Sequence, residues 1–342
     1  MWFQRRSVYI GLGLVALLAY ARLWTGPKPA APVSSSALTH SLGDDTSLEH
    51  PIEMRELLAR ASSRPHLMRW LSLWTAMITL LGLGGICLNV RAVWRRSLIR
   101  LFRYRSRLEV FWSFREVAQL IALLLLVLSL LPFVHLSAIV WVWSELADPR
   151  LWAVISMLAV DSLVILFIWG FAAAKGWRLG RKPSASRAVA IGQGLVSYAA
   201  MFPWIAGLLW LIIRTCQQLH IEPPIEPIHE LLFLEPRRSV VVLTVVLACV
   251  VGPVAEELFF RGVVFRALRS QASRLVAMLI SGGLFAAVHT NLIGFLPIVV
   301  LGCLLADVYE RTGSLWSSIA VHMVHNTLLV GLGLTIRALA AS

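Results

Sequence analysis

Long apolar blocks separated by short charged loops restrict this chain to one class of fold. Several blocks are long enough for a helix to cross a bilayer, which takes about 20 residues, and in lipid only helices and closed barrels satisfy every backbone hydrogen bond. The predicted spans are 70–90, 117–136, 152–172, 189–213, a helix from Val240 to Arg261, 275–295 and 315–338, with shorter apolar runs at 9–23 and 296–308. We therefore predict an all-α, polytopic transmembrane helical bundle with about eight or nine membrane spans.

The charge pattern supports this fold class and predicts an orientation. Only 14% of the 342 residues are charged, against about 25% in a soluble domain, and the net charge is +13. Arginines cluster in the loops at 91–107 and 175–187, as the positive-inside rule predicts for cytoplasmic loops, whereas the proline-rich loop at 221–230 is acidic. The positive charge therefore reflects membrane topology. We expect the lipid bilayer as a partner, no nucleic acid, and a bacterial inner membrane as the location.

The sequence divides into four parts. Residues 1–25 form a signal anchor or a first transmembrane helix. Residues 26–69 form an exported hydrophilic segment, which begins with a linker rich in proline and serine. Residues 70–235 form N-terminal transmembrane helices, and residues 236–337 contain most of the titratable side chains at membrane depth. The last part is therefore where we expect the functional site.

Two adjacent carboxylates lie at the end of the apolar helix that starts at Val240. The sequence V-G-P-V-A-E-E-L-F-F-R places Glu256 and Glu257 at membrane depth, where a charge costs about 2.5 kcal/mol or more. Arg261 follows Glu257 by one helical turn and can pair with it, whereas Glu256 points about 100° away around the helix. One carboxylate is thus held by a cation, and the other is available as a general base.

Three histidines and an asparagine follow on later apolar segments, namely His289, His322, His325 and Asn326. Each has a structural interpretation, since a single intramembrane histidine is often a hydrogen-bonded core residue. Together, however, a carboxylate and two imidazoles can bind and deprotonate a water molecule, with or without a metal, and hydrolytic zinc sites use three such ligands. His322 and Asn326 share one helix face, and His325 could take the place of His322 if the helix is rotated.

Three motifs resemble, in order, those of the CAAX-protease and bacteriocin-processing family of intramembrane proteases. They are E-E-L-F-F-R at 256–261, F-A-A-V-H at 285–289, and V-H-M-V-H-N at 321–326 with the lead-in T-G-S-L-W; the family patterns are EExxxR, FxxxH and HxxxN. The family includes the type II CAAX prenyl endopeptidases of the endoplasmic reticulum and the lysostaphin-resistance-type proteins of bacteria. The resemblance covers roughly residues 236–337.

The resemblance implies a role for each matched residue. Glu256 would activate the hydrolytic water, His289 and His322 would complete the site, and Asn326 would stabilise the tetrahedral intermediate. The family is usually classed as metalloproteases, so the resemblance implies a Zn²⁺ ion held by Glu256, His289 and His322 as one mechanism. A metal-independent glutamate mechanism has also been proposed for the family, and both stay open here.

The leading hypothesis is therefore an intramembrane endopeptidase that cleaves a peptide or membrane-protein substrate near the cytoplasmic face, with Glu257 and Arg261 as supporting residues. The alternative is a non-proteolytic scaffold or immunity-type binding protein, for which segment 26–69 would be the contact surface. A proton-coupled transporter is a third reading, because Asp161 lies within a predicted span, but the sequence has no inverted repeat. Asp161 alone is interpreted as a paired core residue or a helper on the pore side.

Overall fold

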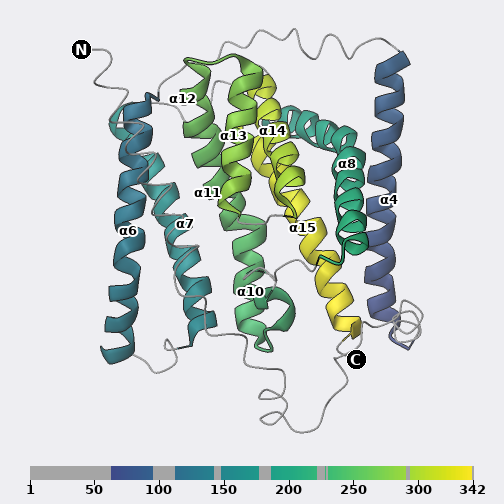
Figure 1. The fold of residues 1–342 in the computed structure, drawn as a ribbon, viewed down its shortest axis with the longest axis horizontal. Coiled ribbons are helices and arrows are strands. Elements are labelled where there is room, and N and C mark those ends of the chain that lie inside the picture. Colours follow the sequence, from purple (N-terminus) through teal and green to yellow (C-terminus); the bar gives the residue numbers. More distant parts are fainter. Residues whose placement is uncertain are drawn as a thin grey trace. The chain divides into compact units, whose positions relative to one another are not determined.

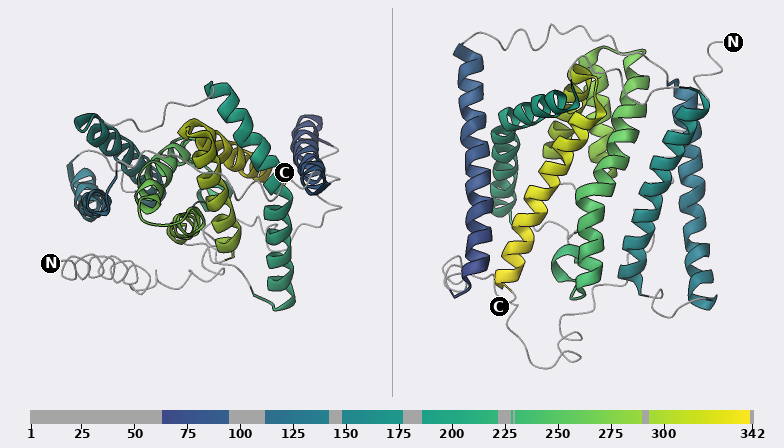
Figure 2. Two further views of the ribbon diagram at one scale, coloured as in Figure 1. Left: turned by 90° about the horizontal axis from the view of Figure 1, so that it is seen from above. Right: turned by 180° about the vertical axis from the view of Figure 1, so that it is seen from behind.

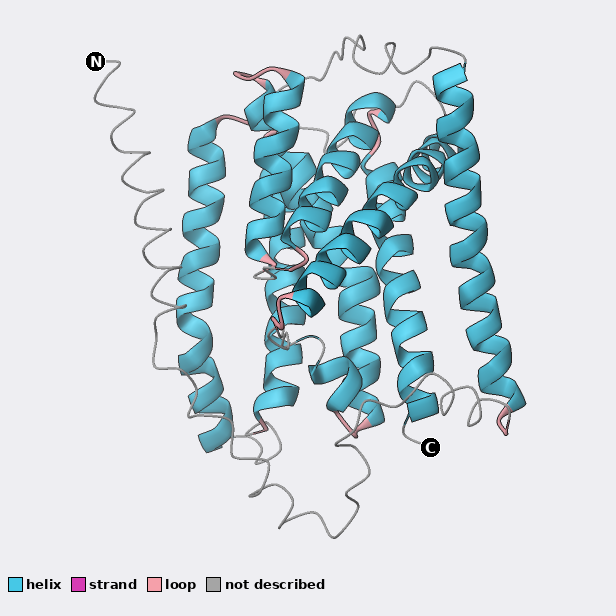
Figure 3. Ribbon diagram, turned by 45° about the vertical axis from the view of Figure 1, so that its right-hand side comes forward, coloured by secondary structure: helices cyan, strands magenta, loops and turns pink. Residues whose placement is uncertain are grey.

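The computed structural model describes residues 63–94, 112–141, 148–176, 186–221, 228, 230–289 and 293–340. The regular elements in these ranges are all helical (Figure 3). The predicted segment 1–25 and most of 26–69 lie outside the described residues, so the fold below is that of the compact unit Ala61–Ser342. Within this unit, the predicted all-α fold is confirmed.

Among the described residues, five helices are long and apolar enough to cross a membrane: Pro65–Trp94, Arg150–Ala174, Arg187–Gln218, Arg238–Arg269 and Leu315–Leu339. The elements outside the site region are α4 (Pro65–Trp94), α6 (Phe114–Trp141), α7 (Pro149–Ala174), α8 (Arg187–Gln218) and the short η2 (Glu230–Leu234). Large apolar side chains such as Leu80 and Trp204 are more than half exposed on these helices, as a lipid-facing surface requires. The prediction of an integral, multi-pass membrane protein is confirmed.

The helix that carries the two glutamates is continuous but irregular. It consists of α10 (Arg238–Val246), η3 (Leu247–Val251), α11 (Gly252–Glu257), η4 (Leu258–Phe265) and α12 (Arg266–Arg269), of which η3 and η4 are π-helical. Pro253 lies just after η3, and a proline inside a regular α-helix lacks a donor and clashes with the carbonyl four residues earlier. The wider turns accommodate this misfit. They also flank the short α11, and π-helical turns are frequent at functional sites.

Helices α13 (Arg274–Val288) and α14 (Phe295–Thr312) form a hairpin that reverses inside the bundle (Figure 1). The predicted single span 275–295 is therefore wrong, because α13 ends at Val288 after 15 residues, about 22 Å. Pro297 lies in the first turn of α14, where its missing N–H has no helical acceptor to lose. The reversal places His289 at the tip of the hairpin, within the depth of the bundle. The final helix is α15 (Leu315–Ala340).

The helix α10–α12 lies between two groups of helices (Figures 1 and 2). On one side, Val164 and Ile168 of α7 pack against Ala255 of α11, and α6 lies outside α7. On the other side are α14 and α15, whose buried residues form a core with Tyr198 of α8, as at Val321. The short segment α11 is therefore enclosed by α7 and by the C-terminal helices.

The ends of α4, α7 and α12 that carry basic residues lie at the same end of this unit, the upper one in Figure 1. Arg91 is in the last turn of α4, Lys175 caps α7, and Arg266 and Arg269 are in the last turn of α12. The loops that follow α4 and α7 therefore leave from the same end of the unit, and the cytoplasmic position of that end stays a prediction.

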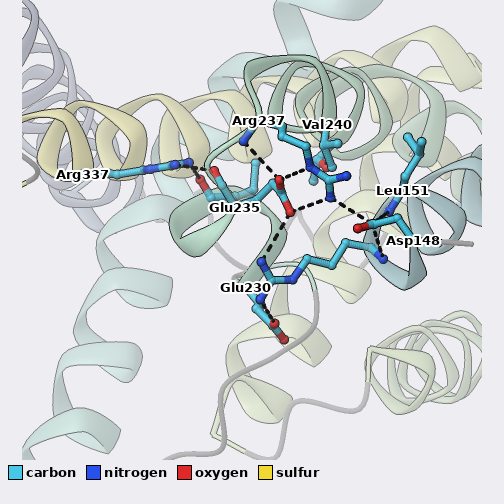
Figure 4. A network of polar contacts seen from close by, with 10 residues as sticks. Asp148, Leu151, Glu230, Glu235, Arg237, Val240 and Arg337 are labelled. Carbon is cyan, nitrogen blue, oxygen red and sulfur yellow. Dashed lines mark hydrogen bonds and ion pairs between the residues drawn. The ribbon is translucent and has the colours of Figure 1, made fainter. Parts of the chain in front are cut away.

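A polar network ties several elements together at the other end (Figure 4). The carboxylate of Glu235 is fully buried; it accepts hydrogen bonds from Arg237 and pairs with Arg150 at 3.5 Å. Arg237 also donates to Asp148 at 2.9 Å, and Asp148 caps α7. Arg337, near the end of α15, donates to the backbone carbonyl of Glu235. The network thus joins the start of α7 and the start of α10 to the end of α15.

Candidate active site

Glu256 lies where three helices meet. It belongs to α11, His289 directly follows α13, and His322 lies on α15. Each histidine has its Nε2 atom 3.8 Å from Glu256 Oε2. The side chain of Glu256 is 30% exposed, but Oε2 is buried and has no hydrogen-bond partner among the described residues. The fold therefore brings together three residues of the three sequence motifs around one carboxylate oxygen.

The orientation of His289 is set by its own helix. Its Nδ1 atom is 2.7 Å from the backbone oxygen of Phe285, and because a carbonyl can only accept, Nδ1 carries the proton and donates it. The imidazole also packs on the Phe285 ring, with centroids 4.6 Å apart. The FxxxH motif therefore has a physical meaning: one turn of helix holds the ring so that the other nitrogen, Nε2, faces Glu256.

The orientation of His322 depends on a buried ion pair. Glu257 and Arg261 are both fully buried and pair at 2.7 Å, which confirms the pairing predicted from their spacing. The same oxygen, Glu257 Oε1, lies 3.1 Å from His322 Nδ1, so this carboxylate accepts from both groups. Arg261 further donates to the backbone oxygen of Gly302 at 3.0 Å and lies over the ring of Phe285. Glu257 and Arg261 thus link α11, α14 and α15.

The protonation pattern leaves acceptors facing one another. Since Nδ1 of His289 and Nδ1 of His322 both donate to oxygen, a ring that is neutral presents the lone pair of Nε2 toward Glu256. A carboxylate and two imidazole lone pairs suit a group that donates two hydrogen bonds, such as water, or a cation. Among the residues that the structure describes, no group of three or more His, Cys, Asp or Glu side chains is placed to hold a metal ion. Zinc binding at this position stays a prediction.

Helix α15 presents its other two polar candidates differently. Asn326 donates from Nδ2 to the backbone oxygen of Ala248 at 2.8 Å, a carbonyl within the π-helical η3, and so connects α15 to the glutamate helix. His325 faces away from the site, because its Nδ1 lies 3.0 Å from the hydroxyl of Tyr198 on α8. The alternative in which His325 takes the place of His322 is therefore wrong.

The T-G-S-L-W lead-in builds the turn that starts α15. Gly313 ends α14: it has a left-handed φ of 66°, and its N–H donates to the backbone oxygen of Tyr309. Glycine adopts this conformation without steric cost. The hydroxyl of Ser317 donates to the backbone oxygen of Ser314 at 2.6 Å and lies 2.6 Å from Thr312 Oγ1. These buried hydroxyls fix where α15 begins and hence which of its faces carries His322.

Asp161 of α7 lies closer to the site than the sequence suggested. A Cβ atom built on Gly252 would be 3.6 Å from Asp161 Oδ2 and 3.7 Å from Glu256 Oε1, so the two carboxylates approach the same small residue. Asp161 forms no ion pair within the described part of the chain, and its position near Glu256 favours the second interpretation, a helper on the pore side. The signal that could have found it is the presence of a carboxylate in an apolar span, which is costly without a role.

Comparisons with known proteins agree with the motifs. Residues 238–328 match the family model described as type II CAAX prenyl endopeptidase Rce1-like. A Bacillus subtilis (strain 168) protein named "Putative membrane peptidase YdiL" is 35% identical over 88 residues, which are 26% of this chain and 36% of that protein. An uncharacterized 24.3 kDa protein of Escherichia coli is 27% identical over 133 residues, 37% of this chain and 61% of that protein. The matches thus cover less than two thirds of either relative, and no solved structure matches.

Proposed function

We propose that this chain, which carries a domain of the Rce1-like CAAX endopeptidase family at residues 238–328, is a membrane endopeptidase that hydrolyses a peptide bond with water activated by Glu256. The observation that carries the proposal is the convergence of two imidazole Nε2 atoms, each at 3.8 Å, on Glu256 Oε2. A water molecule at this position can donate to the carboxylate while the imidazoles hold its orientation.

In the proposed reaction, Glu256 removes one proton from the water as the water oxygen attacks the peptide carbonyl carbon. The new C–O bond forms while the carbonyl electrons move onto oxygen, giving a tetrahedral intermediate. Collapse of the intermediate breaks the C–N bond, and Glu256 returns its proton to the leaving nitrogen. No acyl-enzyme forms, because the nucleophile is water and not a side chain of the chain.

The other residues act by holding this arrangement. Glu257, paired with Arg261, fixes the ring of His322 through Nδ1. Asn326 uses one amide proton for the carbonyl of Ala248, and an amide group has a second proton that can stabilise the oxyanion. These roles follow the family resemblance and are supported by the contacts of each side chain.

The substrate would be a peptide or a membrane protein cleaved toward the cytoplasmic face. Two features support this placement. The short hairpin α13–α14 brings His289 only part of the way through the bundle. The basic residues in the last turns of α4 and α12 lie at the end of the unit from which this hairpin starts. Basic residues gather on the cytoplasmic side of membrane proteins.

Activity of the variant Glu256→Gln tests the proposal. The amide keeps the size of the side chain but cannot accept a proton, so we expect cleavage of a peptide library by the purified, detergent-solubilised protein to fall by about 10²–10⁴-fold. The matched control is Glu230→Gln, which changes a half-exposed carboxylate of the polar network and should keep full activity. Full activity in Glu256→Gln would contradict the proposal, and a binding or scaffold role would then explain an unimpaired biological function.

Metal content distinguishes the two forms of the mechanism. A bound Zn²⁺ would be held by Glu256, His289 and His322 and would lower the pKa of its water. In that case, mass spectrometry of the purified protein should find about one zinc per chain, lost in both His289→Ala and His322→Ala. An active preparation that contains no metal would instead support water activation by the glutamate and the histidines alone.

A further inference from the structure

A groove of about 590 Å³ lies between α4, α8 and α15, on the side of α15 away from Glu256. Its walls are almost entirely apolar or small, as at Leu80, Gly84 and Leu328, and the single charged residue that lines it is Arg91. A volume of this size is typical of sites that bind one small molecule. These walls suit an elongated apolar ligand with a negatively charged group at one end.

The charge of Arg91 has no counter-ion among the residues that the structure describes. Its side chain is exposed and forms no ion pair with another residue that the structure describes. The sequence also offers no local acid, because no Asp or Glu occurs between Glu56 and Glu109, a stretch that contains the whole of α4 and the basic cluster after it. An anion that pairs with Arg91 therefore has to come from outside this part of the chain.

The dimensions of the groove match one leaflet of a bilayer. The residues of α4 that line it run from Met77 to Arg91, which is about 21 Å at 1.5 Å per residue, and half of a bilayer including its headgroup region is about 20–22 Å. Arg91 lies in the last turn of α4, at the same end of the unit as the other basic helix ends (Figure 1). A head group at Arg91 and an acyl chain along α4 fit this length.

We propose that the groove binds one anionic phospholipid, with its phosphate on Arg91 and an acyl chain packed between α4, α8 and α15. Basic pockets between transmembrane helices on the cytoplasmic side are suited to anionic head groups. The binding would act on α15, because Val324 and Leu328 line the groove about 200° and 240° around the helix from His322. The lipid would therefore support the rear face of the helix that presents His322 to Glu256.

Two variants remove different halves of the proposed contact. Arg91→Gln removes the charge. Gly84→Phe fills the groove, and it should be tolerated, because a Cβ at Gly84 meets nothing within 4 Å. The matched controls lie on the same helix: Gly82 has the same open surroundings but does not line the groove, and Arg69 is an exposed arginine near the other end of α4. Gly82→Phe and Arg69→Gln should therefore behave as the unchanged protein.

Native mass spectrometry of the full chain tests the proposal without relying on peptidase activity. The protein is first delipidated and then titrated with vesicles of phosphatidylglycerol or of phosphatidylcholine. We expect one tightly bound phosphatidylglycerol per chain, at least about tenfold preferred over phosphatidylcholine, which corresponds to about 1.4 kcal/mol. Arg91→Gln should lose the preference, and Gly84→Phe should lose the bound lipid. Equal binding of both lipids by the unchanged protein would overturn the proposal, as would an equal effect of Arg69→Gln, which would indicate a general surface charge. Lipid lost in Gly84→Phe but retained without change in Arg91→Gln would also overturn it, since the groove would then take an uncharged chain.

Discussion

The two adjacent glutamates of α11 differ in their surroundings more than in their chemistry. Glu257 is fully buried and shares its Oε1 between Arg261 and His322, whereas Glu256 pairs with no arginine among the described residues and has only the two histidine Nε2 atoms near its Oε2. The Oε2 atoms of both glutamates are buried without a hydrogen-bond partner in the described part of the chain. Successive residues on a helix point about 100° apart, so one turn of helix can direct neighbouring carboxylates to separate partners. One glutamate therefore belongs to the structure that supports the site, and the other faces the position of the reacting water.

This difference predicts opposite effects on stability. Glu257→Gln removes one partner of a fully buried ion pair and leaves Arg261 buried with an uncompensated charge, which costs about 3–5 kcal/mol. Glu256→Gln removes a charge whose buried oxygen has no donor, so it should leave stability unchanged or raise it. Thermal unfolding of both variants in the same detergent measures the difference. An equal loss of stability in the two variants would contradict the assignment of Glu257 as the supporting residue.

Asp161, unlike Glu257, is expected to lower the stability of the fold while it contributes to activity. A carboxylate without an ion pair in an apolar span destabilises the helix that carries it by about 2.5–3.5 kcal/mol. We therefore expect Asp161→Asn to raise the unfolding temperature and to lower peptidase activity, because Asp161 and Glu256 both approach Gly252. The neighbouring Ser162→Ala, which changes an exposed hydroxyl bonded within its own helix, is the control. A lower unfolding temperature in Asp161→Asn would show that Asp161 supports the fold instead.

Among the elements, the helix α10–α12 shows how an irregular stretch is stabilised by its neighbours. The π-helical η3 widens the helix before Pro253, and Asn326 from α15 donates to the carbonyl of Ala248 within η3. A fully buried carbonyl without a donor would cost about 1–3 kcal/mol, and the partly buried carbonyl of Ala248 would cost less. The third motif therefore helps to hold the helix of the first motif in its distorted form, in addition to any role in the reaction.

The polar network at the other end of the unit gives a pH dependence of stability. The hydrogen bonds from Arg237 are the largest cause that holds the pKa of Asp148 and the pKa of Glu235 below their ordinary values of 3.8 and 4.5. Both groups precede the membrane-spanning stretches of their helices. A carboxylate whose pKa is lowered by folding stabilises the fold above its unfolded pKa, and this stabilisation is lost as the pH falls through the folded pKa.

We therefore expect the unfolding temperature to fall as the pH is lowered below about 4.5, the ordinary range of these carboxylates. Arg237→Gln should start from a lower unfolding temperature and show a weaker dependence on acid, because its carboxylates no longer have lowered pKa values. Arg238→Gln, which changes the exposed neighbouring arginine, should follow the unchanged protein. Thermal unfolding at a series of pH values measures the slopes. If the unfolding temperature changed with pH by the same slope in the unchanged protein and in Arg237→Gln, the polar network would not be the source of the pH dependence.

At the scale of the whole molecule, the surroundings of the candidate site extend beyond the segment that matches the family model. The match covers residues 238–328, yet α7 packs against Ala255 beside the glutamates and supplies Asp161. On the other side, α8 contributes Tyr198 to the core of α14 and α15, and α4 closes the groove behind α15. The helices before the matched segment thus enclose the site on one side and support α15 on the other.

The sequence by itself determined the features that depend on local spacing or on composition. Continuous apolar blocks of about 20 residues fit transmembrane helices and are about twice as long as the strands of a barrel, so the multi-pass helical fold follows from length and hydropathy. The pairing of Glu257 with Arg261 follows from a spacing of one helical turn. The place of His322 in the site was already implied by the motif resemblance, and its Nε2 lies 3.8 Å from Glu256 Oε2. Only the tertiary structure decided that α13 reverses after Val288, that the His325 ring contacts Tyr198 on α8, and that Asp161 lies beside the site. These features depend on how helices rotate and pack against partners that are distant in the sequence, and the apolar pattern of a membrane helix does not specify that rotation, because lipid and protein are both apolar surroundings.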